Sequence, residues 1–228
     1  MLKFQPSAYR AEITRALVRP LDVFVRNRVN PNWITTVGVL VNALAALAFF
    51  LFYIPLGGAL VLLGGLLDVV DGHVAKRADM VTVFGSFYDS TTDRIAEVLV
   101  LLGVMSLYLG KEPNLGEPWY AYVVALALAG SLMVSYTRAK AEALGIDCKV
   151  GLMQRAERII LLGGSTLFFG SWHRGVVLNW VMLAMAVLTN LTAVYRIWWV
   201  ARYLRTTEPK PSAPGAQPPR SVPEPANR

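Results

Sequence analysis

The stretch from Asp68 to Asp93 reads DVVDGHVAKRADMVTVFGSFYDSTTD and places four carboxylates within or beside apolar sequence. Asp68 and Asp71 are three residues apart, and Asp89 and Asp93 are four apart, so on helices each pair would share one face. Two facing helices would then direct all four carboxylates at one point. Acidic groups inside a membrane mark functional sites, and four together repel one another unless cations lie between them. The stretch therefore predicts a helical pair that binds hard divalent cations through carboxylate oxygens.

The chain around this stretch has the composition of an integral membrane protein. It has 228 residues, of which 55% are hydrophobic, and its mean hydropathy is +0.46. The net charge of +7 is compatible with nucleic acid. The hydropathy and the placement of the charges favour a membrane surface and anionic substrates instead, so we expect no nucleic-acid partner. The single cysteine, Cys148, excludes an internal disulfide framework.

Six apolar segments are interpreted as membrane spans, which predicts an all-α integral membrane fold with six transmembrane helices in a domain covering residues 31–204. The fifth span has only 14 uncharged residues before the next loop, so Arg158 is expected at the interface or facing the protein interior. The predicted spans cover residues 34–53, 55–76, 82–109, 119–136, 159–172 and 175–195.

The two ends of the chain differ from the spans. Residues 1–30 mix apolar side chains with arginines and are predicted to form an amphipathic helix in the membrane interface, kinked or divided at Pro20. Residues 205–228 are rich in proline and are interpreted as a disordered tail. Lys and Arg gather near both ends and beside the aspartates, which predicts that the termini and the acidic cluster are cytoplasmic.

The acidic stretch resembles the signature of the CDP-alcohol phosphotransferases. That signature has two aspartates, a glycine, an Ala-Arg pair, a second glycine and two further aspartates at fixed spacings. This chain matches at Asp68, Asp71, Gly72, Ala75, Gly85, Asp89 and Asp93. Lys76 stands at the position of the arginine and is followed by Arg77. Lysine keeps the positive charge but lacks the planar fork that binds phosphate bidentately.

The resemblance implies an enzyme that displaces CMP from a CDP-lipid such as CDP-diacylglycerol by an alcohol. It implies a metal site for Mg²⁺ or Mn²⁺, with two ions, formed by Asp68, Asp71, Asp89 and Asp93, and it makes Asp93 the catalytic general base on the acceptor hydroxyl. It further implies a homodimer, and we expect a prokaryotic cell membrane as its location. The implied CDP-lipid-binding residues are Asp68, Gly72, Ala75, Lys76 and Gly85, with Arg77 as a candidate to share the role of Lys76. Thr35, near the start of the first span, is a separate candidate for contact with the nucleotide.

A second stretch, SYTRAKAEALGIDCKVGLMQRAER from Ser135 to Arg158, bears on the acceptor alcohol. Its basic side chains lie on the same predicted side of the membrane as the aspartates and suit a second phosphate. The stretch resembles the subfamily that makes phosphatidylinositol phosphate from inositol phosphate, which implies inositol 1-phosphate as the acceptor. The implied ligands of the acceptor phosphate are Arg138, Lys140, Arg155 and Arg158.

Alternatives remain open at this level. Glycerol 3-phosphate also carries a phosphate, and charge alone does not separate it from inositol 1-phosphate. An unphosphorylated acceptor would leave the basic stretch to serve as a positive-inside anchor. A divalent-cation transporter would also use intramembrane acids, but it would not need Gly72, Ala75 and Gly85 at fixed spacing.

Overall fold

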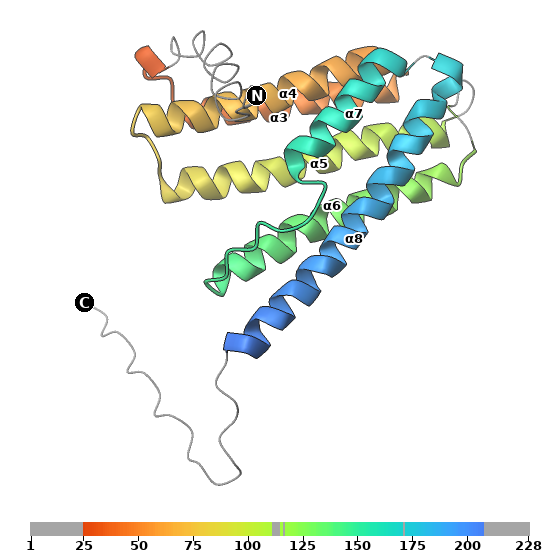
Figure 1. Ribbon diagram of the computed structural model, residues 1–228. Helices are drawn as coiled ribbons and strands as arrows, with labels where there is room; N and C mark the ends of the chain where they lie inside the picture. The colour runs from red at the N-terminus through yellow and green to blue at the C-terminus, as the bar shows by residue number, and fades with distance from the viewer. Residues whose placement is uncertain (1–24, 111–114, 116, 171, 208–228) are drawn as a thin grey trace, which may run out of the picture.

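The computed structural model describes residues 25–110, 115, 117–170 and 172–207, and this part of the chain is helical without strands. The helices lie alongside one another as a bundle, with α3 and α4 adjacent and α8 crossing α6 (Figure 1). This confirms the all-α class. The long helices are α3 (Pro31–Phe50), α4 (Ile54–Arg77), α5 (Val83–Leu109), α6 (Tyr120–Ala143), α7 (Arg155–Phe169) and α8 (Val176–Thr207), with a short 3₁₀ turn η2 (Trp172–Gly175) before α8.

Local sequence explains where the helices next to the acidic stretch begin. Asn30 caps α3 by accepting a hydrogen bond from the Asn32 backbone at 3.0 Å, and Pro31 occupies the first turn. Thr82 caps α5 by accepting from the Gly85 backbone at 2.9 Å. These two caps fix the start of α3, which packs on α4 and α5, and the start of α5, which carries Asp89 and Asp93.

Four helices, α3, α4, α6 and α8, are long and apolar enough to cross a membrane. The two others differ in kind. Helix α5 has 27 residues but carries Asp89, Asp93, Arg94 and Glu97, and α7 has 15 residues. A helix of that length spans about 22 Å, less than the roughly 30 Å of a hydrocarbon core. The protein is thus an integral membrane protein, and the count of six spans stays a prediction.

Glycines bring the helices close together. A Cβ atom at Gly58 of α4 would lie 2.5 Å from the Leu167 nitrogen and 2.8 Å from the Gly163 oxygen of α7. A Cβ atom at Gly103 of α5 would lie 2.6 Å from the Cα atom of Ala46 in α3. These backbone approaches tolerate only glycine, and they hold α4 against α7 and α5 against α3.

Helix α8 is longer than the sequence suggested. The predicted span ended at Tyr195 and the predicted tail began at residue 205, yet the helix continues through Thr207. The reason is packing, because Trp199, Val200 and Leu204 of this extension cover Ile146 and Cys148 of the loop before α7. The remainder of the predicted tail, and residues 1–24 of the predicted interfacial helix with Pro20, lie outside the described residues.

Candidate active site

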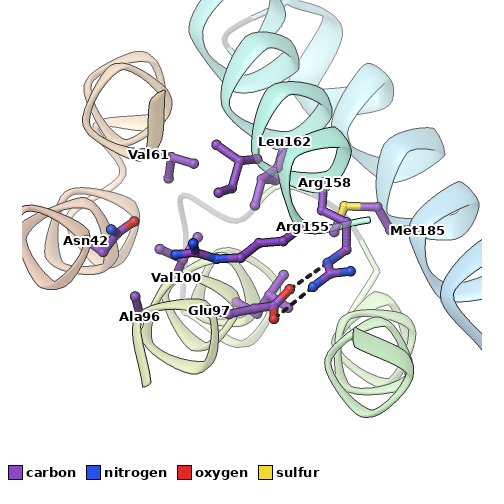
Figure 2. Close-up of a pocket in the computed structure, with 11 residues that line it drawn as sticks. Asn42, Val61, Ala96, Glu97, Val100, Arg155, Arg158, Leu162 and Met185 are labelled. Carbon is purple, nitrogen blue, oxygen red and sulfur yellow. Dashed lines mark hydrogen bonds and ion pairs between the residues drawn. The ribbon is translucent and has the colours of Figure 1, made fainter. Parts of the chain in front are cut away.

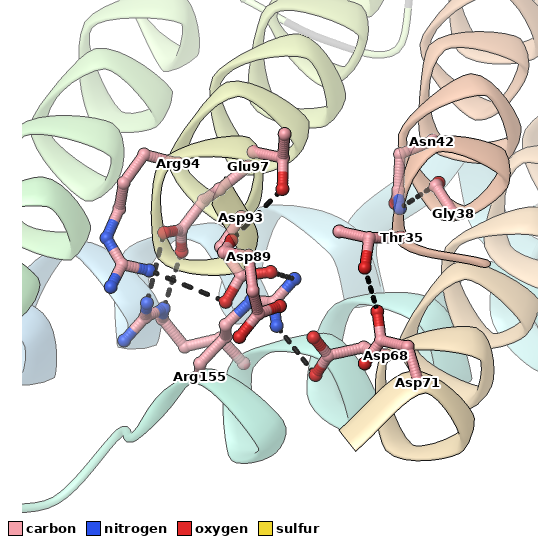
Figure 3. Close-up of polar contacts among 12 residues, drawn as sticks. Thr35, Gly38, Asn42, Asp68, Asp71, Asp89, Asp93, Arg94, Glu97 and Arg155 are labelled. Atoms are coloured by element: carbon pink, nitrogen blue, oxygen red, sulfur yellow. Dashed lines mark hydrogen bonds and ion pairs between the residues drawn. The ribbon is translucent and has the colours of Figure 1, made fainter. Parts of the chain in front are cut away.

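The four aspartates come from two facing helices, as their spacing predicted, and three of them converge on one point. Asp68 and Asp71 lie in the second half of α4, and Asp89 and Asp93 lie in the first half of α5, facing them (Figure 3). One carboxylate oxygen from each of Asp68, Asp71 and Asp89 lies within 4.8 Å of the other two. Asp93 lies one helical turn farther along α5, at the edge of this triad.

The triad has the chemistry of a divalent-cation site. Asp89 Oδ1 is buried and has no hydrogen-bond partner in the described part of the chain. Buried acceptors are normally satisfied, so an unpartnered carboxylate oxygen between two other carboxylates fits an oxygen-ligated cation. Asp71 Oδ2 accepts a 2.6 Å hydrogen bond from Thr35 Oγ1 of α3, which orients that carboxylate. The next residue, Thr36, lies 2.9 Å from the Tyr88 hydroxyl and ties α3 to the turn of α5 that carries Asp89.

Arg155, the first residue of α7, lies between two of the carboxylates. Its Nη1 is 2.7 Å from Asp68 Oδ2 and its Nη2 is 2.6 Å from Asp93 Oδ1. Arg94 Nη1 is 4.0 Å from the other Asp93 oxygen, too far for a direct hydrogen bond. Arg155 of the basic stretch thus meets Asp68 and Asp93 of the acidic stretch, from which it is more than 60 residues apart in sequence (Figure 3).

A cavity of about 170 Å³ opens on one side of the aspartates, and we call it the glycine cavity. It contains most of the residues predicted to bind the CDP-lipid. A Cβ atom at Gly72 would meet nothing within 4 Å, so this glycine leaves open space beside Asp71. Arg77 does not line the cavity, and Asp68 faces the other side of the site. The lining residues near the aspartates are Asn32, Thr35, Asp71, Gly72, Ala75, Lys76, Thr82, Gly85, Ser86 and Asp89.

A second cavity, of about 300 Å³, opens on the opposite side, and we call it the arginine cavity. It draws side chains from α4, α5, α6, α7 and α8, so five helices meet there. Guanidinium groups bind phosphate and carboxylate oxygens through paired donors, which makes this cavity suited to an anion. Its polar lining residues are Asp68, Asp93, Arg94, Ser135, Arg138, Gln154, Arg155, Arg158 and Arg196.

The basic residues predicted for the acceptor are only partly those that line the arginine cavity. Arg138, Arg155 and Arg158 line it, whereas Lys140 is exposed near the end of α6 and does not. Arg138 Nε donates to Glu142 Oε1 at 2.8 Å, and both side chains of this ion pair are more than 40% exposed.

Arg94 and Arg196 also line the cavity, although neither was among the predicted ligands of the acceptor phosphate, and Arg196 was not predicted to take part in the site at all. Arg196 is 2% exposed and donates to the backbone carbonyls of Val134 and Val150. The signal was an arginine within the apolar run of α8, because a charged residue at membrane depth usually serves a site. Because the sixth span was predicted to end at Tyr195, Arg196 was placed outside the membrane and was not considered for the site.

Arg158 is bonded to a carboxylate as well as to a backbone carbonyl. Its Nε and Nη2 donate to the two carboxylate oxygens of Glu97 at 2.7 and 3.1 Å (Figure 2). Its Nη1 donates to the Met153 carbonyl at 2.7 Å. The Arg158 side chain is 3% exposed and that of Glu97 is 10% exposed. The expectation that Arg158 faces the protein interior is confirmed, and the guanidinium is held by protein groups.

The glycine cavity and the arginine cavity both adjoin the aspartates. Asp71 and Asp89 line the glycine cavity, and Asp68 and Asp93 line the arginine cavity. A cation held by the carboxylates would therefore contact ligands in either cavity. Such an arrangement suits the transfer of a phosphoryl-type group between two anionic molecules.

Comparison with known proteins identifies the family of the chain. The model of the CDP-alcohol phosphatidyltransferase family matches residues 28–204. Archaetidylinositol phosphate synthase of Methanothermobacter thermautotrophicus is 35% identical over 179 residues, which cover 76% of this chain and 84% of that protein. Phosphatidylinositol phosphate synthase of Cutibacterium acnes is 31% identical over 198 residues, with 85% and 93% covered.

The structural comparison agrees. Phosphatidylinositol phosphate synthase of Mycobacterium tuberculosis, solved with CDP-DAG bound, superposes with a TM-score of 0.71 at 25% identity, over 82% of this chain and 94% of the other. The same enzyme in complex with manganese and citrate gives a TM-score of 0.71 at 26% identity, over 81% and 88%. On the family match and the identity to these relatives, the chain belongs to the CDP-alcohol phosphatidyltransferase family.

Proposed function

We propose that this protein transfers a phosphatidyl-type group from a CDP-lipid to inositol 1-phosphate and releases CMP. The observation that carries the proposal is the meeting of the glycine cavity and the arginine cavity at the aspartates. One cavity suits a nucleotide diphosphate and the other suits a phosphorylated alcohol. The similarity to archaetidylinositol phosphate and phosphatidylinositol phosphate synthases supports this acceptor over glycerol 3-phosphate.

The nucleotide end of the CDP-lipid would occupy the glycine cavity. Gly72 leaves open space there, and Ala75 and Gly85 line the cavity with little side-chain bulk. Lys76, which lines the cavity, would contact the phosphates, and Arg77 would add charge at the same end of α4. Asp68 would reach the diphosphate from the opposite side. Thr35 would act through Asp71, to which it donates.

Asp68, Asp71 and Asp89 would hold Mg²⁺ or Mn²⁺, with Asp93 completing a site for two ions. The manganese complex of the Mycobacterium tuberculosis enzyme supports this assignment. Bound divalent cations would neutralise and orient the diphosphate of the CDP-lipid. The protein's own part is to fix the carboxylates, through Thr35 on Asp71 and the caps at the starts of α3 and α5.

Asp93 would take the proton from the acceptor hydroxyl. As the hydroxyl oxygen bonds to the lipid-linked phosphorus, the bond from that phosphorus to the bridging oxygen of CMP breaks, and CMP leaves with the electron pair. Asp93 is suited to this step because it lines the arginine cavity, where the acceptor would lie. Its Oδ1 is oriented by Arg155, while its Oδ2 has no hydrogen bond to Arg94.

Arg138 and Arg155 would bind the phosphate of the acceptor. Arg138 is free to turn toward it because its exposed ion pair with Glu142 contributes little stability. Arg155 would link the acceptor phosphate to Asp93, and the buried Arg196 would form the floor of the cavity. Lys140 would add positive charge at the same end of α6 without lining the cavity.

The membrane arrangement is also part of the proposal. The termini and the active site would face the cytoplasm of a prokaryotic cell, since the basic side chains gather on the side of the aspartates. Both a lipid and a water-soluble acceptor would reach the site from that side. As the family resemblance implies, the protein would work as a homodimer.

The test is CMP release by purified protein with Mg²⁺ and either CDP-diacylglycerol or an ether-linked CDP-lipid. Inositol 1-phosphate, glycerol 3-phosphate, free inositol and serine are offered separately. We expect release with inositol 1-phosphate that EDTA abolishes and Mn²⁺ restores. Release with glycerol 3-phosphate alone would change the acceptor, and release with an unphosphorylated alcohol alone would remove the role of the arginine cavity.

A further inference from the structure

We propose that Glu97 and Arg158 form a positioning pair that sets the acceptor side of the active site without touching the substrate. The inference rests on the proposed function, because it concerns how the phosphorylated acceptor is held. It reassigns Arg158, which the sequence had suggested as a phosphate ligand, and gives a role to Glu97, which lies one helical turn beyond Asp93.

The first observation is how completely the pair is tied to protein groups. Arg158 uses all three guanidinium nitrogens, two on the Glu97 carboxylate and one on the Met153 carbonyl. Its side chain is 3% exposed, compared with 22% for Arg155. A guanidinium fixed in this way is a poor candidate to move toward a phosphate that comes and goes.

The second observation is that two ion pairs lie one helical turn apart across the same gap. Asp93 and Glu97 are four residues apart on α5, and Arg155 and Arg158 are three apart on α7. Asp93 pairs with Arg155 beside the aspartate triad, and Glu97 pairs with Arg158 one turn farther along α5 (Figures 2 and 3). Helix α5 packs mainly on α3 and α6, and α7 mainly on α4 and α8. The side-chain pairs therefore set how α7 faces α5.

The third observation connects the pair of Glu97 and Arg158 to the start of α7. Met153 has a positive φ of 59° and lies immediately before Gln154, the capping residue of the helix. The hydrogen bond from Arg158 to the Met153 carbonyl holds this strained residue. Gln154 and Arg155, which follow it, both line the arginine cavity. A fixed Met153 therefore fixes the start of α7 and with it the position of the Arg155 side chain.

The consequence is a separation of roles within the basic stretch. Arg155 contacts the reacting groups, and Arg158 with Glu97 sets where Arg155 lies. Since small displacements of a positioned group can cost about 100-fold in rate, loss of the pair should weaken handling of the acceptor more than handling of the CDP-lipid.

The experiment replaces the whole pair and compares it with single changes. Glu97→Met with Arg158→Met removes both charges, and a buried pair replaced by apolar side chains often keeps the fold. We expect the thermal stability of this double variant in detergent to stay near that of the unaltered protein. We expect its KM for inositol 1-phosphate to rise about tenfold or more, with KM for CDP-diacylglycerol within about twofold.

The single variants Glu97→Gln and Arg158→Lys give intermediate cases. Glu97→Gln keeps one acceptor for Arg158, and Arg158→Lys keeps the charge but cannot hold Glu97 and Met153 together as the planar fork does. Both should raise the acceptor KM. The control is Asp147→Asn with Lys149→Met, which removes an exposed ion pair from the loop that contains Met153. The two side chains of that pair are 66% and 68% exposed, and both KM values should be unchanged.

The outcomes separate the inference from the proposed function. If the unaltered protein turns over and the double variant is stable with an unchanged acceptor KM, the positioning role is wrong. An equal rise in both KM values, or unfolding of every variant including Arg158→Lys, would assign the pair to the fold alone. If the unaltered protein releases no CMP with any phosphorylated acceptor, the proposed function fails and this inference fails with it.

Discussion

The aspartate side and the arginine side of the active site are built in different ways. The aspartates come from two consecutive helices and lie within 26 residues, so helical spacing alone brings them together. The arginine cavity is formed by side chains of five helices, from Asp68 of α4 to Arg196 of α8. The difference teaches that a site encoded by local spacing can be read from sequence, whereas one assembled across the bundle depends on how the helices pack.

The largest effect should follow from a change at the boundary between the two sides. Asp93→Asn keeps the size of the side chain and its contact with Arg155 but removes the base. We expect turnover to fall by about 10²–10⁴-fold while binding of CDP-lipid persists. Single-turnover CMP release and nucleotide binding, measured on the same preparation, check this. Substantial turnover by the variant would reject Asp93 as the base.

Removing the residue that joins the two sides should come next. Arg155→Met keeps much of the buried side chain but breaks the contacts to Asp68 and Asp93. We expect KM for inositol 1-phosphate to rise and kcat to fall together, by about 100-fold in kcat/KM. Initial rates over a range of both substrates measure this. A change confined to KM for the CDP-lipid would contradict the assignment of Arg155 to the acceptor.

A smaller effect is expected where α3 supports the aspartate side. Thr35→Val keeps the shape of the residue and removes the hydrogen bond to Asp71. Groups that orient a metal ligand typically contribute about 10–100-fold in metal affinity. Titration of Mn²⁺ into the purified protein, followed by electron paramagnetic resonance, measures that affinity without turnover. Thr36→Val, which breaks the link to Tyr88, is a matched control one residue away.

If Thr35→Val binds Mn²⁺ as tightly as the unaltered protein, the orienting role of Thr35 is wrong. If both threonine variants lose the same affinity, the effect belongs to the helix start in general rather than to the Asp71 contact.

The smallest effect should come from Lys76→Arg. Lys76 lines the glycine cavity at the position where the family signature has arginine. The planar fork would add a second hydrogen bond to a phosphate oxygen, so we expect KM for CDP-diacylglycerol to fall by about twofold to fivefold. KM for inositol 1-phosphate should not change. A change in the acceptor KM alone would place Lys76 on the wrong side of the site.

Much of the aspartate side was predictable, including the two facing helices and the convergence of Asp68, Asp71 and Asp89. The glycine cavity was predictable as well, since Gly72, Ala75 and Gly85 belong to the same short signature. These features depend on neighbours in sequence. The start of α3 at Pro31 was readable for the same reason, because Asn30 and Pro31 mark it locally.

The arginine side was only partly predictable. Its residues were predicted from their charge, and the charge of a residue does not show where its side chain points. Arg158 was therefore grouped with Arg155, although its guanidinium group binds Glu97. Arg196 was left outside the last span because hydropathy ends at Tyr195, while the helix continues and buries it. The contact of Thr35 with Asp71 joins residues 36 positions apart and has no local signal.

The most direct test of the two-sided account compares one variant from each cavity. Gly72→Val adds bulk to open space in the glycine cavity, and Arg138→Met removes a half-exposed charge from the arginine cavity, so neither should disturb the fold. The measurement is KM for CDP-diacylglycerol and for inositol 1-phosphate in both. The account predicts that Gly72→Val raises only the CDP-lipid KM and that Arg138→Met raises only the acceptor KM. A rise of both constants in either variant, or the reverse pattern, would contradict it.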